Sequence, residues 1–201
     1  MAVFPIHYFG SVGYYRMLVN ATEVVFEVHE HFVKQSHRSR MEILSPNGVQ
    51  KLVIPTVKTG KRRFTKDVQI SYAENWQKDH WKSLEAAYRR SPYFEYYEDQ
   101  LKALIWSKPT HLSEYNLSLH DHILQLLKIS KPYQLTAQFK ESEHLNYRLE
   151  NFNIQDEIFS GWNYENYLQV FSDRIEFVEN LSILDMLFNI GPRSRDVLFT
   201  D

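Results

Sequence analysis

Residues 2–28 read AVFPIHYFGSVGYYRMLVNATEVVFEV. The apolar residues 2–9 predict a strand, the glycine-containing stretch 10–13 breaks it, and residues 14–20 predict a short helix. A β-branched run within residues 23–32 then predicts a second, buried strand. A strand, a glycine loop, a helix and a strand in this order are typical of an α/β fold.

A β-hairpin is predicted after these elements. Polar and apolar residues alternate from Arg38 to Ile43, as in a half-exposed strand, and Ser45-Pro46-Asn47-Gly48 is interpreted as a turn with Asn-Gly at its centre. The second arm is predicted over residues 50–57. The stretch 59–65 is polar and basic and is interpreted as an exposed loop that could close over a ligand, with a further short strand over 68–72.

The middle of the chain changes to a helical period. Trp76, His80, Leu84 and Tyr88 stand four residues apart and predict one buried helix face. The remaining predicted elements are a helix that Ser91-Pro92 begins, a helix over 112–129, a strand over 133–139, a long polar loop over 140–160, a short strand over 167–171 and a helix over 180–190 that Gly191-Pro192 ends. We therefore predict a single α/β domain over residues 1–201. Its mixed sheet is built mainly from the N-terminal third and packed with helices, with a helical subregion at about residues 75–130.

Composition excludes several classes of site. The chain has no cysteine, which rules out disulfides, thiolate zinc sites and a cysteine nucleophile. No stretch of 18 or more apolar residues suggests a membrane span, and the N-terminus lacks the pattern of a signal peptide. A cytoplasmic protein is the expectation.

Charge is distributed unevenly along the chain. Residues 34–66 hold nine Lys or Arg and one acidic residue, a net charge of +8, whereas the whole chain has −2, so the other 168 residues carry −10. A basic patch on an acidic protein concentrates anions at one place. The expected partner is therefore an anionic small molecule that bears phosphate or carboxylate. A nucleic-acid partner is not expected, since Lys61-Arg62-Arg63 is much narrower than the usual basic footprint.

Arg38, Arg40 and Lys34 are the candidate anion-binding residues. The two arginines lie two apart on a predicted strand, so both guanidinium groups would face one side and grip a phosphate with Lys34. The alternative is an ordinary solvated strand face. The hypothesis requires both arginines to point into a cleft.

His80 and Glu27 are the candidate catalytic residues. A histidine is suited to general acid–base work, but a partly buried histidine held by the core is the competing interpretation of His80. Glu27 would be a base or a substrate contact and shares one predicted strand face with His29 and His31. A metal site would need a third ligand at diagnostic spacing, so neither a metal nor a cofactor is expected.

Two helix starts are further candidates. The stretch 10–13 could hold a phosphate with backbone N–H groups, or be only a tight turn. Asp185 is predicted to close a capping box with Ser182, and this helix start could add to the anion site. Three aromatic residues are predicted to line the cleft: Tyr8, Tyr14 and Trp76.

Four segments together resemble the WbqC-like family. They are Tyr8–Tyr15, residues 34–55 with Lys34-Gln35-Ser36-His37-Arg38-Ser39-Arg40, residues 75–97 with Asn75-Trp76-Gln77-Lys78-Asp79-His80-Trp81, and residues 180–191. Many members open with a His-Gln-Pro-x-Tyr-x-Pro pattern, but here the histidine slot is Phe4. The resemblance implies a role near bacterial surface-polysaccharide or O-antigen biosynthesis, beside enzymes that handle nucleotide sugars, without specifying a reaction.

Two functions stay open. One is a group-transfer enzyme of envelope-glycan biosynthesis that binds a phosphorylated or nucleotide-linked substrate. The other is a non-catalytic binding or scaffold protein that uses the basic segment to dock an acidic partner. An enzyme should gather its cations in a pocket beside a histidine or carboxylate, whereas a scaffold should spread them over a flat face.

Overall fold

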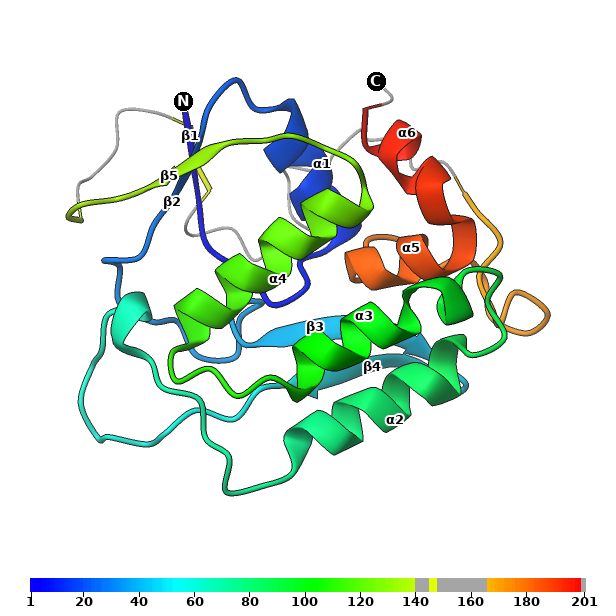
Figure 1. The fold of residues 1–201 in the computed structure, drawn as a ribbon, viewed down its shortest axis with the longest axis horizontal. Coiled ribbons are helices and arrows are strands. Elements are labelled where there is room, and N and C mark those ends of the chain that lie inside the picture. The colour runs from blue at the N-terminus through cyan, green and yellow to red at the C-terminus, as the bar shows by residue number, and fades with distance from the viewer. Residues whose placement is uncertain (140–144, 148–165, 200–201) are drawn as a thin grey trace.

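The computed structural model describes residues 1–139, 145–147 and 166–199 (Figure 1). Most of the polar loop predicted over 140–160 lies outside these residues. Within the described parts of the chain, no helix is both long and apolar enough to cross a membrane.

A parallel sheet forms one part of the fold. Its strand order is β5 (Tyr133–Leu135), β2 (Val24–Phe26), β1 (Ala2–Phe4) and β6 (Leu145–Asn146). Helix α1 (Val12–Asn20) connects β1 to β2, with Ala2 paired to Val24 and Phe4 to Phe26. The predicted strand–loop–helix–strand unit is therefore confirmed. Both strands are shorter than expected; β1 ends where Pro5 has no N–H to continue the ladder.

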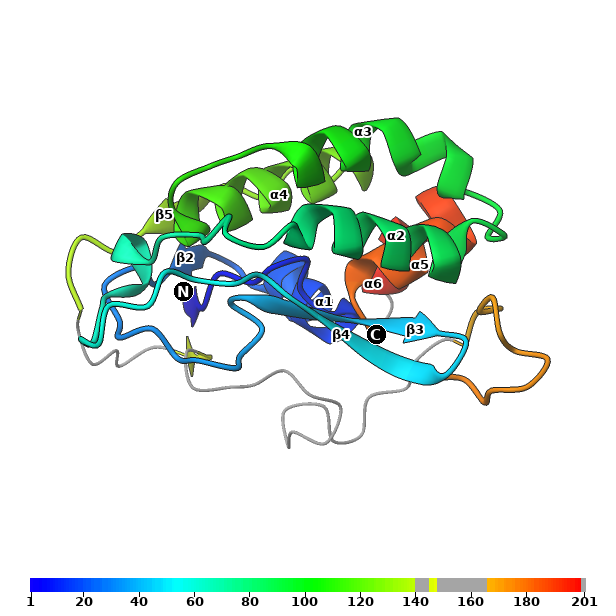
Figure 2. The same cartoon turned by 90° about the horizontal axis from the view of Figure 1, so that it is seen from below.

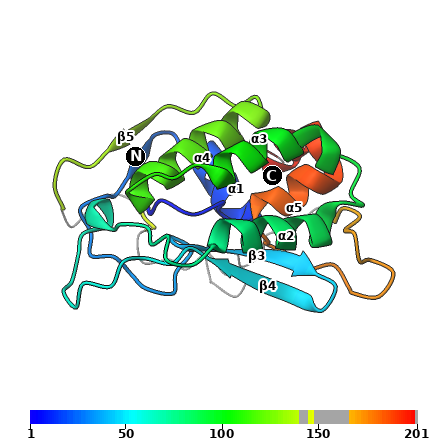
Figure 3. The same ribbon diagram turned by 60° about the horizontal axis from the view of Figure 1, so that its bottom comes forward.

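An antiparallel hairpin forms a second, separate sheet. It consists of β3 (Arg40–Ser45) and β4 (Gly48–Val53), and Ser45 pairs with Gly48 across the turn. Met41, Ile43 and Leu52 are buried on one face. Helix α2 (Trp76–Tyr88) covers the hairpin (Figure 3). The predicted mixed architecture is thus confirmed, with parallel and antiparallel strands in two sheets instead of one.

The helical subregion is confirmed as well. Helix α2 is followed by α3 (Phe94–Trp106) and α4 (Leu112–Leu126), which lie together over one side of the strands (Figure 2). All four residues of the predicted α2 face, Trp76, His80, Leu84 and Tyr88, are buried. The C-terminal part holds α5 (Ile183–Ile190) and α6 (Ser194–Phe199), separated by a 3-10 turn, η3 (Gly191–Arg193).

Three local predictions are wrong. Ser91 does not cap α3, because its hydroxyl donates to the Tyr88 carbonyl at 2.6 Å and α3 begins only at Phe94. Residues 68–72 make single bridges instead of a strand, and a 3-10 turn, η1 (Thr65–Asp67), precedes them. Residues 167–171 are not a strand, since the side chain of Gln169 bonds both the N–H and the carbonyl of Val178 and closes a loop.

Gly191 ends α5 in a backbone conformation that favours glycine. Its φ is +56°, and a Cβ there would lie 2.5 Å from the Tyr93 ring. We expect Gly191→Ala to lower the free energy of unfolding by about 2–3 kcal/mol, measured by urea denaturation. Gly60→Ala is the matched control, because its φ of +67° is similar but the space around it is open. Equal losses in the two variants would show that the Tyr93 contact costs nothing.

Candidate functional site

The carboxyl ends of the parallel strands share one edge of the sheet. Strand β1 has β2, the next strand in the chain, as its neighbour on one side and β6 as its neighbour on the other. The order of the strands therefore reverses at β1. In α/β sheets, ligands bind outside the carboxyl ends at such a reversal of strand order. The segments at this edge are residues 5–11 after β1, residues 27–38 after β2 and Thr136 after β5.

The start of α1 is already filled by protein groups. The Gly13 N–H donates to Asn180 Oδ1 at 2.7 Å, the Val12 N–H to the Leu181 carbonyl at 2.9 Å, and the Tyr14 N–H to Ser11 Oγ at 3.3 Å. A Cβ at Gly10 would lie 2.4 Å from the Tyr14 ring, which explains the glycine. The geometry favours the tight-turn interpretation of residues 10–13 over the phosphate-binding one.

His7 lies buried directly after β1 among aromatic and cationic groups. Its ring stacks on Tyr14 with centroids 4.3 Å apart, and the His37 ring is 5.5 Å away. Burial lowers the pKa of His7 well below its ordinary value, and the neighbouring His37 and Arg38 lower it further. His7 is therefore a neutral imidazole at pH 7. Tyr14, predicted to line a cleft, is instead buried and donates to the Pro5 carbonyl at 2.9 Å.

Arg38 is placed differently from the prediction. It lies in a turn before β3, only Arg40 is on the strand, and the two do not form a forked site with Lys34. Arg38 Nε donates to Glu30 Oε1 at 2.6 Å, and both side chains are less than a tenth exposed. The Arg38 carbonyl also accepts from Asn116 Nδ2 at 2.7 Å. The Arg38 carbonyl thus ties the segment after β2 to α4, while the guanidinium binds Glu30 within that segment. Of the predicted trio, only Lys34 is exposed.

Glu27 joins the ends of two strands. Its Oε1 accepts from the His29 N–H at 2.7 Å and from Thr136 Oγ1 at 2.8 Å. Because β2 ends at Phe26, the strand face predicted for Glu27, His29 and His31 does not form. Among the described residues, no group of three His, Cys, Asp or Glu lies close enough to hold a metal ion.

His80 is held by hydrogen bonds on both ring nitrogens. The Tyr8 hydroxyl donates to Nδ1 at 3.0 Å, and Nε2 donates to the Val53 carbonyl at 3.2 Å, which sets the tautomer. Burial lowers the pKa of His80 to about 4. Trp76 packs edge-on against the ring at 5.0 Å. This geometry favours the structural interpretation of His80, and Tyr8 and Trp76 are core residues here instead of cleft walls.

Asp185 does not form the predicted capping box. The Ser182 N–H, which a capping box would satisfy, already donates to the Glu42 carbonyl at 2.8 Å. The Asp185 carboxylate instead accepts from the Tyr167 hydroxyl at 2.7 Å and from Gln169 Nε2 at 2.9 Å. Burial raises the pKa of Asp185, and these two hydrogen bonds oppose the rise. Ser182 does cap α5, accepting from the Leu184 N–H at 3.3 Å.

A basic groove lies beside this edge. It brings Lys34 together with the cations of residues 58–63, which are distant from it in the sequence. Its volume is about 420 Å³. The lining residues are Phe32, Lys34, Thr56, Val57, Lys58, Thr59, Gly60, Lys61, Arg62 and Arg63. Five of them are cationic and none is acidic. None of the five forms an ion pair within the described parts of the chain. The loop predicted over residues 59–65 therefore supplies half of the residues that line the groove.

Backbone bonds tie the groove to the edge of the sheet. The Phe32 N–H donates to the Arg63 carbonyl and the Thr65 N–H to the Glu30 carbonyl, each at 2.9 Å. In Figure 1 the cyan loop extends beyond the ends of β1 and β2. The buried Glu30–Arg38 pair thus lies on the same segment as Lys34 and supports one wall of the groove.

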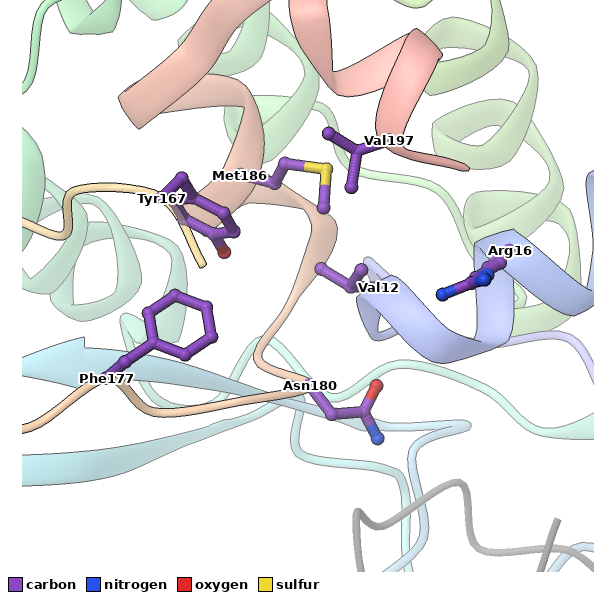
Figure 4. Close-up of a pocket in the computed structure, with 7 residues that line it drawn as sticks. All are labelled: Val12, Arg16, Tyr167, Phe177, Asn180, Met186 and Val197. Atoms are coloured by element: carbon purple, nitrogen blue, oxygen red, sulfur yellow. The ribbon is translucent and has the colours of Figure 1, made fainter. Parts of the chain in front are cut away.

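A second concavity, small and mostly apolar, lies between α1 and the C-terminal helices. Its volume is only about 10 Å³. Figure 4 shows the residues around it: Val12, Arg16, Tyr167, Phe177, Asn180, Met186 and Val197. It is too small for a substrate.

The sequence predictions missed three residues of the edge. Glu30 falls within the strand predicted over residues 23–32, whereas β2 ends at Phe26. Nothing in the local sequence pattern pairs Glu30 with Arg38. His37 is not part of the charge pattern that singles out Lys34, Arg38 and Arg40. Thr136 lies more than 100 residues from Glu27, and its role follows only from the parallel pairing of β5 with β2.

Comparison with known proteins identifies one family. The model of the WbqC-like protein family matches residues 6–158. The chain is also similar to a Mycobacterium tuberculosis protein named "Uncharacterized protein Rv1507c". The two are 24% identical over 228 residues, which cover 98% of this chain and 96% of the relative. No solved structure gives a significant match.

Proposed function

This chain belongs to the WbqC-like protein family, and we propose that it is a group-transfer enzyme that binds a phosphorylated or nucleotide-linked substrate. One observation carries the proposal: a groove with five cations and no acidic residue lies beside the carboxyl edge of a parallel sheet. In keeping with the family resemblance, the proposed substrate belongs to bacterial surface-polysaccharide or cell-envelope biosynthesis.

The groove replaces the anion site first predicted. Lys34 keeps its role as a phosphate contact, joined by Lys58, Lys61, Arg62 and Arg63. Arg38 acts as a positioning residue through its ion pair with Glu30. Arg40 is half-buried at the start of β3 and is not among the residues that line the groove. Glu27, at the same edge of the sheet, is the proposed proton acceptor.

A thermal-shift titration tests the proposal. Phosphate, nucleotides, nucleotide sugars and acyl carriers would be titrated against the full chain. A ligand at 100 times its Kd that binds only the folded state adds about 2.7 kcal/mol of stability. We expect a saturable shift with a phosphorylated compound that Lys61→Ser/Arg62→Ser removes.

Lys78→Ser/Lys82→Ser on α2 is the matched control. It removes two exposed lysines of the same charge outside the groove, and the shift should persist. A shift lost equally in both double variants would mean that net charge, not the groove, holds the ligand. The absence of a shift with every anion would overturn the proposal.

A second candidate function is a binding protein without catalysis. It is favoured by His80, whose two ring nitrogens are both occupied by the protein and whose ring is neutral at pH 7. Phosphorus NMR of a bound nucleotide sugar over time would separate the two functions. Release of the nucleotide in the wild type but not in Glu27→Gln supports the enzyme, whereas a ligand that stays intact with every acceptor supports the binding protein.

A further inference from the structure

We infer that the basic groove holds the diphosphate of a nucleoside diphosphate, and that the ring pair His31–Phe64 at its rim stacks on the base. The inference rests on the proposed function, because it names the chemical class of the ligand at that site. It adds a base-binding element that the charge pattern alone does not show.

The ring pair and the groove are built from the same two chain segments. His31 and Phe64 form an antiparallel bridge, and their rings stack with centroids 5.1 Å apart and an interplanar angle of 11°. Phe32 and Arg63, the adjacent residues in each segment, line the groove. An aromatic platform therefore directly adjoins the cationic walls.

The exposure of the ring pair needs an explanation. Phe64 is 41% exposed and His31 is exposed, although a large aromatic residue gains most by burial. A planar base can stack on such a ring, and an aromatic side chain typically contributes a five- to hundredfold gain in affinity per base. A flat, exposed platform beside a phosphate site is the arrangement that a nucleotide requires.

The charge and size of the groove favour two phosphates over one. The five cations of the groove form no ion pair with any residue that the structure describes. Their charge exceeds the roughly two negative charges of a monophosphate at neutral pH, whereas a diphosphate brings about three. The volume of about 420 Å³ lies within the range of small-molecule sites. A diphosphate can thus contact both the Lys34 wall and the loop that carries Lys61 and Arg62.

A nucleotide fits these features better than a strand of RNA does. Outside residues 34–66 the chain carries a net charge of −10, which would repel the phosphates of a strand that extends beyond the groove. The basic surface accommodates one nucleotide, and binding of RNA is the alternative that the experiment below would detect.

Calorimetric titration with ADP, UDP, pyrophosphate and inorganic phosphate tests the inference. We expect both nucleotides to bind more tightly than pyrophosphate, and pyrophosphate more tightly than phosphate. Phe64→Leu should weaken ADP and UDP by about tenfold and leave pyrophosphate unchanged, because only the stacking surface is lost. Arg62→Ser should weaken all three diphosphates by about tenfold, because it removes a charge-assisted contact.

Tyr96→Leu is the control for the aromatic change, since Tyr96 on α3 is 70% exposed and lies outside the groove. Lys82→Ser on α2 is the control for charge. Neither should change any affinity.

Several results would overturn the inference. If phosphate bound as tightly as pyrophosphate and both depended on Arg62, the diphosphate assignment would be wrong while a phosphorylated substrate would still stand. If Phe64→Leu weakened pyrophosphate as much as ADP, the ring pair would not be a base platform. Binding of a uridine oligonucleotide more tightly than UDP would replace the nucleotide by RNA, and binding of no anion would remove the proposed function as well.

Discussion

Glu30→Ala should lower the free energy of unfolding by about 3–5 kcal/mol, measured by urea denaturation at pH 7. The Glu30–Arg38 pair is 2.6 Å long, and the side chains are 7% and 3% exposed. Removing one partner of such a pair leaves a buried charge without its counterion, and this is far more costly than losing an exposed pair. The same variant should weaken ligand binding in the groove, because the ion pair fixes the segment whose backbone, at the Glu30 carbonyl, holds the loop at Thr65.

Two further variants make this result specific. Glu42→Ala breaks the exposed pair with Lys51, 3.4 Å apart, and should cost less than about 1 kcal/mol. The double variant Glu30→Leu/Arg38→Met should recover most of the stability, because a buried pair replaced by apolar groups of similar size is often neutral. If Glu30→Ala and Glu42→Ala lost the same stability, the buried pair would not support this segment.

Two predictions that rested on local sequence patterns were confirmed. The four-residue spacing from Trp76 to Tyr88 predicted the buried face of α2, because a helix face depends only on neighbours in the chain. Asn47-Gly48 predicted the hairpin for the same reason: Gly48 has a φ of +101°, a turn conformation that favours glycine.

Partners distant in sequence explain the failures. Ser182 and Asp185 have the spacing of a capping box, but the Glu42 carbonyl takes the N–H that Asp185 would have bonded. Arg38 alternates with Arg40 as in a strand, yet Glu30 binds it before the strand begins. In each case a residue from another element competes for the same group, and a local pattern holds no information about that competitor.

The sequence predicted that the candidate site is basic, but not which side chains form it. The excess of +8 over residues 34–66 located the basic groove within the chain. The sequence offers no basis for choosing among its cations, since burial decides which of them can meet a ligand. Lys61 and Arg62 are exposed, while Arg38 is only 2% exposed. This difference in exposure depends on how the loop over residues 56–63 packs against the segment after β2.

The protein should lose stability steeply below pH 6.5, and His120 should account for a measurable part of the loss. His120 is 2% exposed and lies among the rings of Tyr15, Phe26 and Tyr133. Neither ring nitrogen has a hydrogen-bond partner in the parts of the chain that the structure describes. Burial lowers its pKa to about 4.

The sign follows from proton binding in the two states. Between pH 6.5 and about 4 the unfolded chain binds a proton at this histidine and the folded protein does not, so stability is complete above pH 6.5 and falls as the pH decreases. From pH 7 to pH 5 the loss is about 2 kcal/mol for one such group. His80, whose pKa burial also lowers to about 4, adds a similar loss. Asp185 acts in the opposite direction, because burial raises the pKa of its carboxyl.

His120→Phe and His120→Gln separate titration from packing. Both remove the ionisable ring, so both should reduce the loss between pH 7 and pH 5 by about 2 kcal/mol, measured by urea denaturation at each pH. At pH 7 they should differ: phenylalanine removes two polar nitrogens that have no partner among the described residues, and should keep or raise stability. Glutamine buries an amide in an aromatic cage and should lower stability by about 1–3 kcal/mol. A wild-type slope retained in both variants would show that His120 does not titrate on unfolding.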